Sequence, residues 1–138
     1  MVKIKLDNGA YMPERAHEDD AGLDLRTTEE AMLWPGTSLC FNTGVHIEIP
    51  KGYFGKIESK SGLNVNAGIV SCGGIIDAGY TGSIIVKLYN LGEQGYHFNN
   101  GDKIAQLVIQ PCIAPELEIV EHLDDTERGD GGFGSTGR

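Results

Sequence analysis

The stretch Val45-His46-Ile47-Glu48-Ile49-Pro50 decides the fold class of this chain. Its apolar side chains recur at every second position with His46 and Glu48 between them, which is the period of a β-strand with one buried face. Pro50 ends the run, because proline lacks the N–H group that a continuing ladder needs. The stretch therefore predicts a half-buried strand.

Further short segments of the same kind occur along the chain. We predict strands over 53–57, 83–89, 103–110 and 117–120, and the run 83–89, apolar except for Lys87, predicts a strand buried on both faces. Turn signals separate these segments: Asn8-Gly9, Pro35-Gly36, Gly73-Gly74, Gly92 and Asn100-Gly101. The one helical candidate is a short piece starting at Ser61. The sequence thus predicts an all-β fold, a distorted jelly-roll-like barrel with one short helix and a flexible C-terminal tail.

Composition narrows the possible functions. With 138 residues the chain forms one domain, and its 20 glycines, about twice the usual ~7%, indicate tight turns. A formal net charge of −9 argues against nucleic-acid binding. An acidic protein that binds a polyphosphate must concentrate its few cations at the site or recruit a divalent metal.

Cysteine usage and the N-terminus bear on the compartment. Cys40, Cys72 and Cys112 are odd in number and widely spaced, which predicts buried, reduced side chains. Residues 1–5 contain no apolar signal region, and no apolar run approaches the ~18 residues of a membrane span. We therefore expect a cytoplasmic protein with no membrane partner.

The last eleven residues, 128–138, combine five glycines with two arginines, two hydroxyls and Phe133. Glycines let backbone N–H groups approach an oxyanion, arginine pairs with phosphate, and an aromatic ring stacks on a base. This mixture predicts a mobile tail over 127–138 that closes on a nucleotide, attached to a domain over 1–126. A disordered linker is the alternative on composition alone. Ser135 stands where a Walker A loop needs lysine, which excludes that motif.

A zinc site is considered and rejected. His46-Ile47-Glu48 matches one half of the zinc-deaminase signature and Pro111-Cys112 starts the other, but Pro115 stands where the second cysteine is required. We predict that His46 is an ordinary surface histidine. The same holds for His17, His97 and His122, which lack ligand-spaced partners.

The segment 74–82 contains a candidate base. Asp77 follows two isoleucines in a turn that leads into a strand, and in a partly desolvated position it suits a general base for water. Tyr80, three residues later, can present its ring to a sugar. A turn residue that bonds its own backbone is the alternative reading of Asp77.

Three further polar positions stand out. Lys60-Ser61-Gly62 has the composition of an anion-binding helix start, with a simple N-cap as the alternative. Gln106 lies inside an apolar strand and needs a hydrogen-bond partner if it is buried. Asp24 is a lone carboxylate between leucines.

In their order these segments resemble the five motifs of the homotrimeric dUTPases, over residues 21–138. The motifs are Ala21-Gly-x-Asp24-Leu, Lys60-Ser-Gly-Leu63, Ile76-Asp77-x-x-Tyr80-x-Gly82, Gly101-Asp-Lys-Ile-Ala-Gln106-Leu107 and Arg128-Gly-x-Gly-Gly-Phe133-Gly-Ser-Thr-Gly. Lys60 departs from the pattern, because the family usually has arginine there. The exchange loses a bidentate contact to phosphate.

The resemblance implies Mg²⁺-dependent hydrolysis of dUTP to dUMP and pyrophosphate, with water attacking the α-phosphorus. It implies that Asp77 is the general base, that Tyr80 packs under deoxyribose, and that the turn between Gly68 and Ile76 reads uracil. The implied substrate-binding set is Lys60, Ser61, Gly62, Ser71, Gly74, Ile76, Tyr80, Gln106, Arg128, Phe133, Gly134, Ser135 and Thr136. Asp24 is implied to approach the water shell of Mg²⁺, and the family forms trimers with shared sites.

Two other functions stay open at this point. One is a dCTP deaminase-like or bifunctional enzyme of the same fold, since Ile-Asp-Ala-Gly-Tyr-x-Gly occurs in that relative too. The other is a nucleotide-sensing binding protein that kept the pocket. The C-terminal motif favours the pyrophosphatase over the first, and the presence of Asp77 favours an enzyme over the second.

Overall fold

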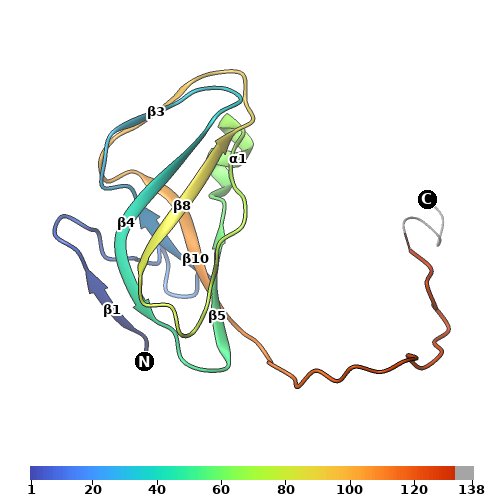
Figure 1. Cartoon of the computed structure of the whole chain (residues 1–138). Helices are drawn as coiled ribbons and strands as arrows, with labels where there is room; N and C mark the ends of the chain where they lie inside the picture. Colours follow the sequence, from blue (N-terminus) through green and yellow to red (C-terminus); the bar gives the residue numbers. More distant parts are fainter. Residues whose placement is uncertain (133–138) are drawn as a thin grey trace.

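The fold is taken from a computed structural model, which describes residues 1–132. Two four-stranded antiparallel sheets form its body (Figure 1). The first contains, in order, β1 (Lys3–Leu6), β4 (Ser38–Glu48), β8 (Ser83–Asn90) and β6 (Ile69–Ser71). The second contains β2 (Gly22–Arg26), β10 (Lys103–Pro111), β5 (Tyr53–Glu58) and β7 (Ile75–Ile76). A two-stranded ladder of β3 (Ala31–Leu33) and β9 (Tyr96–Phe98) and the helix α1 (Ser61–Ala67) complete it.

The predicted all-β, jelly-roll-like class with one short helix is confirmed for the described residues. The ladders leave β1 and β6 at the edges of the first sheet, and β2 and β7 at the edges of the second. The body therefore consists of two open sheets and not of one closed barrel.

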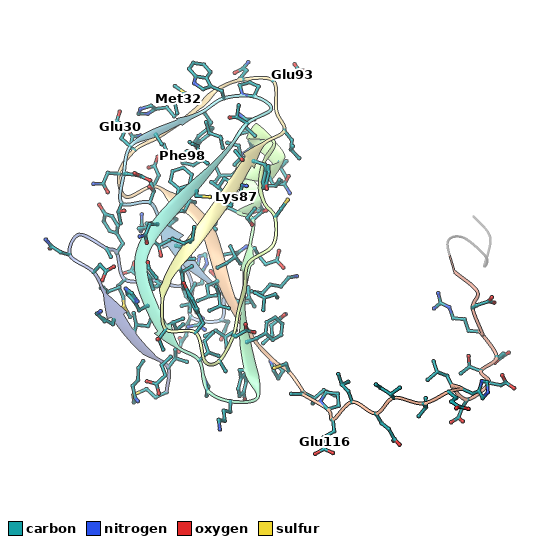
Figure 2. The ribbon with its side chains drawn as sticks, in the orientation of Figure 1. Glu30, Met32, Lys87, Glu93, Phe98 and Glu116 are labelled. Carbon is teal, nitrogen blue, oxygen red and sulfur yellow. The ribbon has the colours of Figure 1, made fainter. Side chains whose placement is uncertain are left out.

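The core lies between the inward faces of the sheets. Val45, Ile47 and Ile49 are each at most 2% exposed, as their alternation predicts. Phe41 and Phe98 meet edge to face with ring centroids 5.3 Å apart, which joins the β3–β9 ladder to the same core (Figure 2 labels Phe98).

The prediction that 83–89 is buried on both faces is wrong for this chain. Ile84, Val86 and Leu88 are fully buried, whereas Ile85 and Lys87 point outward. The reason is the layering: the first sheet packs on the second with one face, and no element of the described chain covers its outer face.

The predicted strand over 117–120 is also wrong. β10 ends at Pro111, and residues 112–132 extend away from the body without strand structure (Figure 1), with Glu116 labelled on this segment in Figure 2. Leu117 and Ile119 are fully exposed there. A strand needs a ladder partner, and this segment leaves both sheets behind.

The cysteines depart from expectation as well. Cys40, Cys72 and Cys112 are exposed thiols. Cys40 lies at an outward position of β4, Cys72 in the turn after β6, and Cys112 directly after β10. No helix within residues 1–132 is long and apolar enough to cross a membrane.

Candidate active site

A glycine turn between β6 and β7 lies flat against β5. Gly73 and Gly74 have φ of 82° and 103°, in the region that favours glycine. A Cβ on Gly74 would stand 2.7 Å from Cβ of Ile57, and the Ile57 N–H group donates a 2.9 Å hydrogen bond to the Gly74 carbonyl. Only a residue without a side chain fits this approach, so the turn presents its outer main chain to solvent at a fixed place.

Asp77 follows the buried Ile76 at the end of this hairpin. The Tyr80 N–H group donates to the Asp77 carbonyl at 3.0 Å, and the Tyr80 hydroxyl donates to the Ser83 carbonyl at 2.9 Å. Ile76, Asp77 and Tyr80 line a pocket of about 240 Å³ together with Gly74, Ile75 and Ile85. The hairpin, the carboxylate and the ring therefore share one open depression.

The surroundings of Asp77 differ from both sequence-based readings. Its side chain is exposed in the single chain, not partly desolvated, because it lies on the rim of the depression. Its carboxylate makes no hydrogen bond or ion pair within residues 1–132, so it does not cap its own turn. The oxygens are free to hold a water molecule.

A second cluster forms around Asp24 on β2, whose side chain is 5% exposed. Lys60 Nζ lies 2.5 Å from Oδ1, and Lys103 Nζ lies 2.6 Å from Oδ2 as an ion pair. Burial by itself raises the pKa of Asp24, but the hydrogen bonds and charges of Lys103 and Lys60 outweigh it and lower that pKa below its ordinary value. Asp24 is thus a buried, ionised carboxylate between two cations.

Gln106 on β10 lies opposite Asp24 in the ladder and connects the two clusters. Its Nε2 donates to the Ser59 carbonyl at 3.1 Å, which supplies the partner that its strand position requires. The Ser59 hydroxyl accepts a 2.9 Å hydrogen bond from the Ser71 N–H group at the start of the glycine turn. Gly22 makes room for Gln106, since a Cβ there would stand 2.0 Å from Oε1.

Helix α1 begins at Ser61, and its N-cap is Lys60, with φ of −75° and ψ of 127° and no side-chain cap hydrogen bond. The alternative interpretation of this segment as a simple side-chain N-cap is therefore wrong. Ser61 and Gly62 lie exposed in the first turn, next to the lysine that reaches Asp24.

The described part of the tail, residues 127–132, is not brought to either cluster. Arg128 lies on the extended segment, where its Nε donates to the Gly131 carbonyl at 2.9 Å. The predicted contacts of Phe133, Gly134, Ser135 and Thr136 lie outside the described residues.

Two residues near the site, Lys103 and Ser59, were not singled out by the sequence, and a third, His46, was expected to be an ordinary surface residue. Lys103 lies inside the fourth motif, and its positive charge there was the signal that the sequence offered. Its contact with Asp24 is visible only in the structure. Ser59 offered only its position before Lys60. His46, expected on the surface, has a side chain only 19% exposed, because β1 and Thr81 enclose it. Within residues 1–132 neither it nor any other histidine belongs to a group of three metal-ligating side chains.

Comparisons with known proteins agree with this architecture. A family model described as dUTPase matches residues 8–137. A deoxyuridine 5'-triphosphate nucleotidohydrolase of Clostridium tetani is 42% identical over 140 residues, which cover 99% of this chain and 97% of the relative. The enzyme of the same name from Corynebacterium glutamicum is 46% identical over 138 residues, with 98% and 93% covered.

Solved structures show the same likeness. A point mutant of a dUTPase of Staphylococcus bacteriophage 80alpha, bound to dUpNHpp, superposes with a TM-score of 0.90 at 34% identity, covering 100% of this chain and 99% of the other. A point mutant of a dUTPase of phage phi11 of S. aureus, described with a structural Mg(II) ion, gives a TM-score of 0.83 at 33% identity, with 88% and 97% covered.

The comparisons define the class of protein, an enzyme that hydrolyses a nucleoside triphosphate. The chain belongs to the dUTPase family. It is thus an enzyme of nucleotide metabolism, a dUTP diphosphatase by class.

Proposed function

We propose that this chain hydrolyses dUTP to dUMP and pyrophosphate by attack of a water molecule on the α-phosphorus, with Asp77 as the general base. The observation that carries the proposal is the carboxylate of Asp77, which is free of other contacts within residues 1–132 at the end of the glycine hairpin. The bound dUpNHpp of the phage 80alpha relative, a dUTP analogue, supports the substrate.

The hairpin is proposed to select the nucleoside. The main chain around Ser71, Gly74 and Ile76 is proposed to pair with uracil through groups other than the Ser71 N–H group and the Gly74 carbonyl, which already bond Ser59 and Ile57. A turn held this closely against Ile57 rejects a base with other donors. Tyr80, held through its hydroxyl to Ser83, is proposed to pack under deoxyribose and leave no room for a 2′-hydroxyl. The water is then deprotonated at Asp77 as the bond to phosphorus forms.

The second cluster is proposed to bind the phosphates. Lys60 and Lys103 bring two positive charges to one place in a protein of net charge −9, and Gln106, Ser61 and Gly62 add donors. Such fixed cations and donors stabilise charge on transferring phosphoryl groups. A single ammonium at Lys60 contacts phosphate without the bidentate geometry of arginine.

The donor set fits a magnesium ion that is carried mainly by the substrate. Residues 1–132 contain no group of three metal-ligating side chains, and Mg²⁺ commonly binds through phosphates and water with one or two carboxylates. Asp24, ionised as its lowered pKa requires, is the carboxylate that would accept from metal-bound water. The ion would neutralise charge on the triphosphate.

The C-terminal segment supports a homotrimer with shared sites. Five apolar residues of 112–132 are exposed by 51–101%, a surface that a soluble chain normally buries: Ile113, Leu117, Ile119, Val120 and Leu123. The segment extends away from its own body, so only another chain can cover it and receive the residues 127–138 that we propose close the site (Figure 1).

The spacing of the two clusters points the same way. Asp77 follows Ile76, which pairs with Gly55 on β5. Lys60 lies five residues beyond Gly55, so about 16 Å of extended backbone separates Lys60 from the level of Asp77. We therefore propose that the base and the phosphate-binding lysine that serve one nucleotide come from different subunits.

The test is pyrophosphate release from dUTP, dCTP, dTTP and UTP with Mg²⁺, by the wild type and by Asp77→Asn. We expect dUTP to be hydrolysed selectively, and Asp77→Asn to bind dUpNHpp normally while kcat falls by roughly 10²- to 10⁴-fold. Asp19→Asn, an exposed carboxylate outside the motifs, is the control. Deamination of dCTP would favour the deaminase-like alternative, and binding without turnover would favour a nucleotide sensor.

A further inference from the structure

We propose that His46 is a positioning residue for the loop that carries Asp77 and Tyr80, and that its doubly protonated ring holds this loop in place. The inference rests on the proposed roles of Asp77 and Tyr80. It adds a residue that lies outside the five motifs and ties the geometry of the site to a proton.

A bulge in β4 aims His46 at the loop. Between the ladder pairs Asn42–Ile85 and His46–Ser83, β4 advances four residues while β8 advances two. Extra residues in one strand of a pair bend it and redirect side chains. As a result the ring of His46 lies between Thr81 and the turn that follows β1.

Both ring nitrogens face acceptors. Nδ1 lies 2.8 Å from the carbonyl oxygen of Thr81. Nε2, shielded from solvent, lies 3.1 Å from Oδ1 of Asp7, an ion-pair contact that departs from the angle of an aligned hydrogen bond. A neutral imidazole carries one N–H group, so it can satisfy only one of these acceptors, whereas an imidazolium satisfies both.

The charged groups around the ring favour protonation on balance. The contact to the Thr81 carbonyl and that to Asp7 raise the pKa of His46 above the ordinary histidine value, while burial and the positive charge of Lys5, its neighbour on β1, oppose them. Glu48, two residues further along β4, is paired with Lys3 at 3.1 Å.

The groups on the remaining sides are few. On β8 the ladder partner of His46 is the uncharged Ser83, and the titratable residues of the loop itself are Asp77 and Tyr80. Within residues 1–132, Asp7 is thus the one acidic group that contacts the ring.

The loop is fastened to β4 at two points on either side of the bulge. The Ser83 hydroxyl donates to Oδ1 of Asn42 at 2.5 Å, and the Thr81 carbonyl accepts from His46. Tyr80 is held to Ser83 by the hydrogen bond from its hydroxyl to the Ser83 carbonyl. Thr81 directly follows Tyr80 and lies four residues after Asp77 in the same loop, so we infer that the attachment of its carbonyl positions both residues.

Loss of the proton weakens this attachment. If the neutral ring keeps its hydrogen towards Asp7, the Nδ1 lone pair opposes the Thr81 carbonyl. If it keeps the hydrogen towards Thr81, the Nε2 lone pair opposes the Asp7 carboxylate. Either arrangement costs one favourable contact that exists at lower pH.

The first experiment compares KM for dUTP in the wild type and in His46→Gln between about pH 5.5 and 9.5, which brackets histidine titration. We expect the variant's KM to exceed the wild-type value about fivefold at low pH, the effect of one lost hydrogen bond, and to equal it at high pH. His97→Gln removes a histidine paired with the exposed Glu30 on the β3–β9 ladder, and its KM ratio should stay near one at every pH.

The second experiment follows the histidine rings by NMR without relying on catalysis. The midpoint of the His46 titration should lie above the ordinary histidine value. Asp7→Asn should lower the midpoint of His46 and move the pH at which the KM ratio falls by the same amount, because the carboxylate no longer favours the charged ring.

Two results would overturn the proposal: a KM ratio for His46→Gln that is constant across pH, or a His46 ring that titrates at or below the ordinary histidine value. Either could occur with dUTP hydrolysis intact and Asp77→Asn inactive, which would leave the proposed function standing. Conversely, full activity of Asp77→Asn would refute the role of Asp77 as general base. The titration of His46 and its response to Asp7→Asn could still be measured by NMR and would still test the role of His46.

Discussion

Replacing Asp24 by Asn tests whether the buried carboxylate holds the two lysines in the folded enzyme. The change keeps the shape of the side chain but leaves Lys60 and Lys103 facing each other without the charge that neutralises them. Breaking a fully buried ion pair costs about 3–5 kcal/mol. The lysine side chains are 27% and 39% exposed, so solvent screens part of that cost, and we expect a loss of about 2–3 kcal/mol.

Denaturant unfolding at neutral pH measures this loss directly, and a fall in Tm of roughly 6–10 °C should accompany it. Glu48→Gln is the matched control, since it breaks an ion pair with Lys3 whose side chains are 58% and 75% exposed. That control should cost less than about 1 kcal/mol. If the two variants lose the same stability, burial of Asp24 does not matter and the reasoning is refuted.

The pH dependence of the Asp24→Asn effect has a definite sign. The folded-state pKa of Asp24 lies below its ordinary value, so the carboxylate stabilises the fold fully above the unfolded pKa of about 3.9. This stabilisation disappears as the pH falls through the folded pKa. The difference between the wild type and the variant should therefore shrink below about pH 4.

The remaining predictions concern the nucleoside and the tail. Tyr80→Ala should reduce the ratio of kcat/KM for dUTP to that for UTP, whereas Tyr80→Phe should preserve it, because the ring and not the hydroxyl excludes ribose. Equal losses on both substrates would show that Tyr80 only supports the loop. Deletion of residues 127–138 should lower kcat for dUTP strongly. It should leave Tm and the trimer mass by sedimentation nearly unchanged, since residues 127–130 are exposed and Gly131 and Gly132 have no side chain to bury. Full activity of the truncated enzyme would make the tail a linker.

The strands that were correctly predicted from the sequence have a recognisable local pattern. In β4, where one face of the strand is buried, apolar and polar side chains alternate. The alternation of Val45, Ile47 and Ile49 and the closing Pro50 hold in β4 whatever the partner strand is. The pattern of 117–120 was equally apolar, yet that segment forms no strand, because strand formation depends on a ladder partner that local sequence does not reveal.

Burial was harder to anticipate than strand position. Ile85 resembles Ile84 and Val86 in the sequence, but a sheet that packs on one side leaves one of its faces outside. Asp77 was expected to be partly desolvated from its neighbours Ile75 and Ile76, but only Ile76 is buried, and Asp77 is exposed at an open pocket.

The sequence by itself determined the all-β class, the short helix at Ser61 and the order of motifs that places this chain among the dUTPases, because these depend on residue types and spacing along the chain. Only the tertiary structure decided that Asp24 lies between Lys60 and Lys103, that Ser59 links the two clusters, and that His46 reaches the loop of Tyr80. Each of these contacts joins residues that are at least twelve positions apart, and such distances are set by ladder register, a bulge and sheet packing, which no local pattern records.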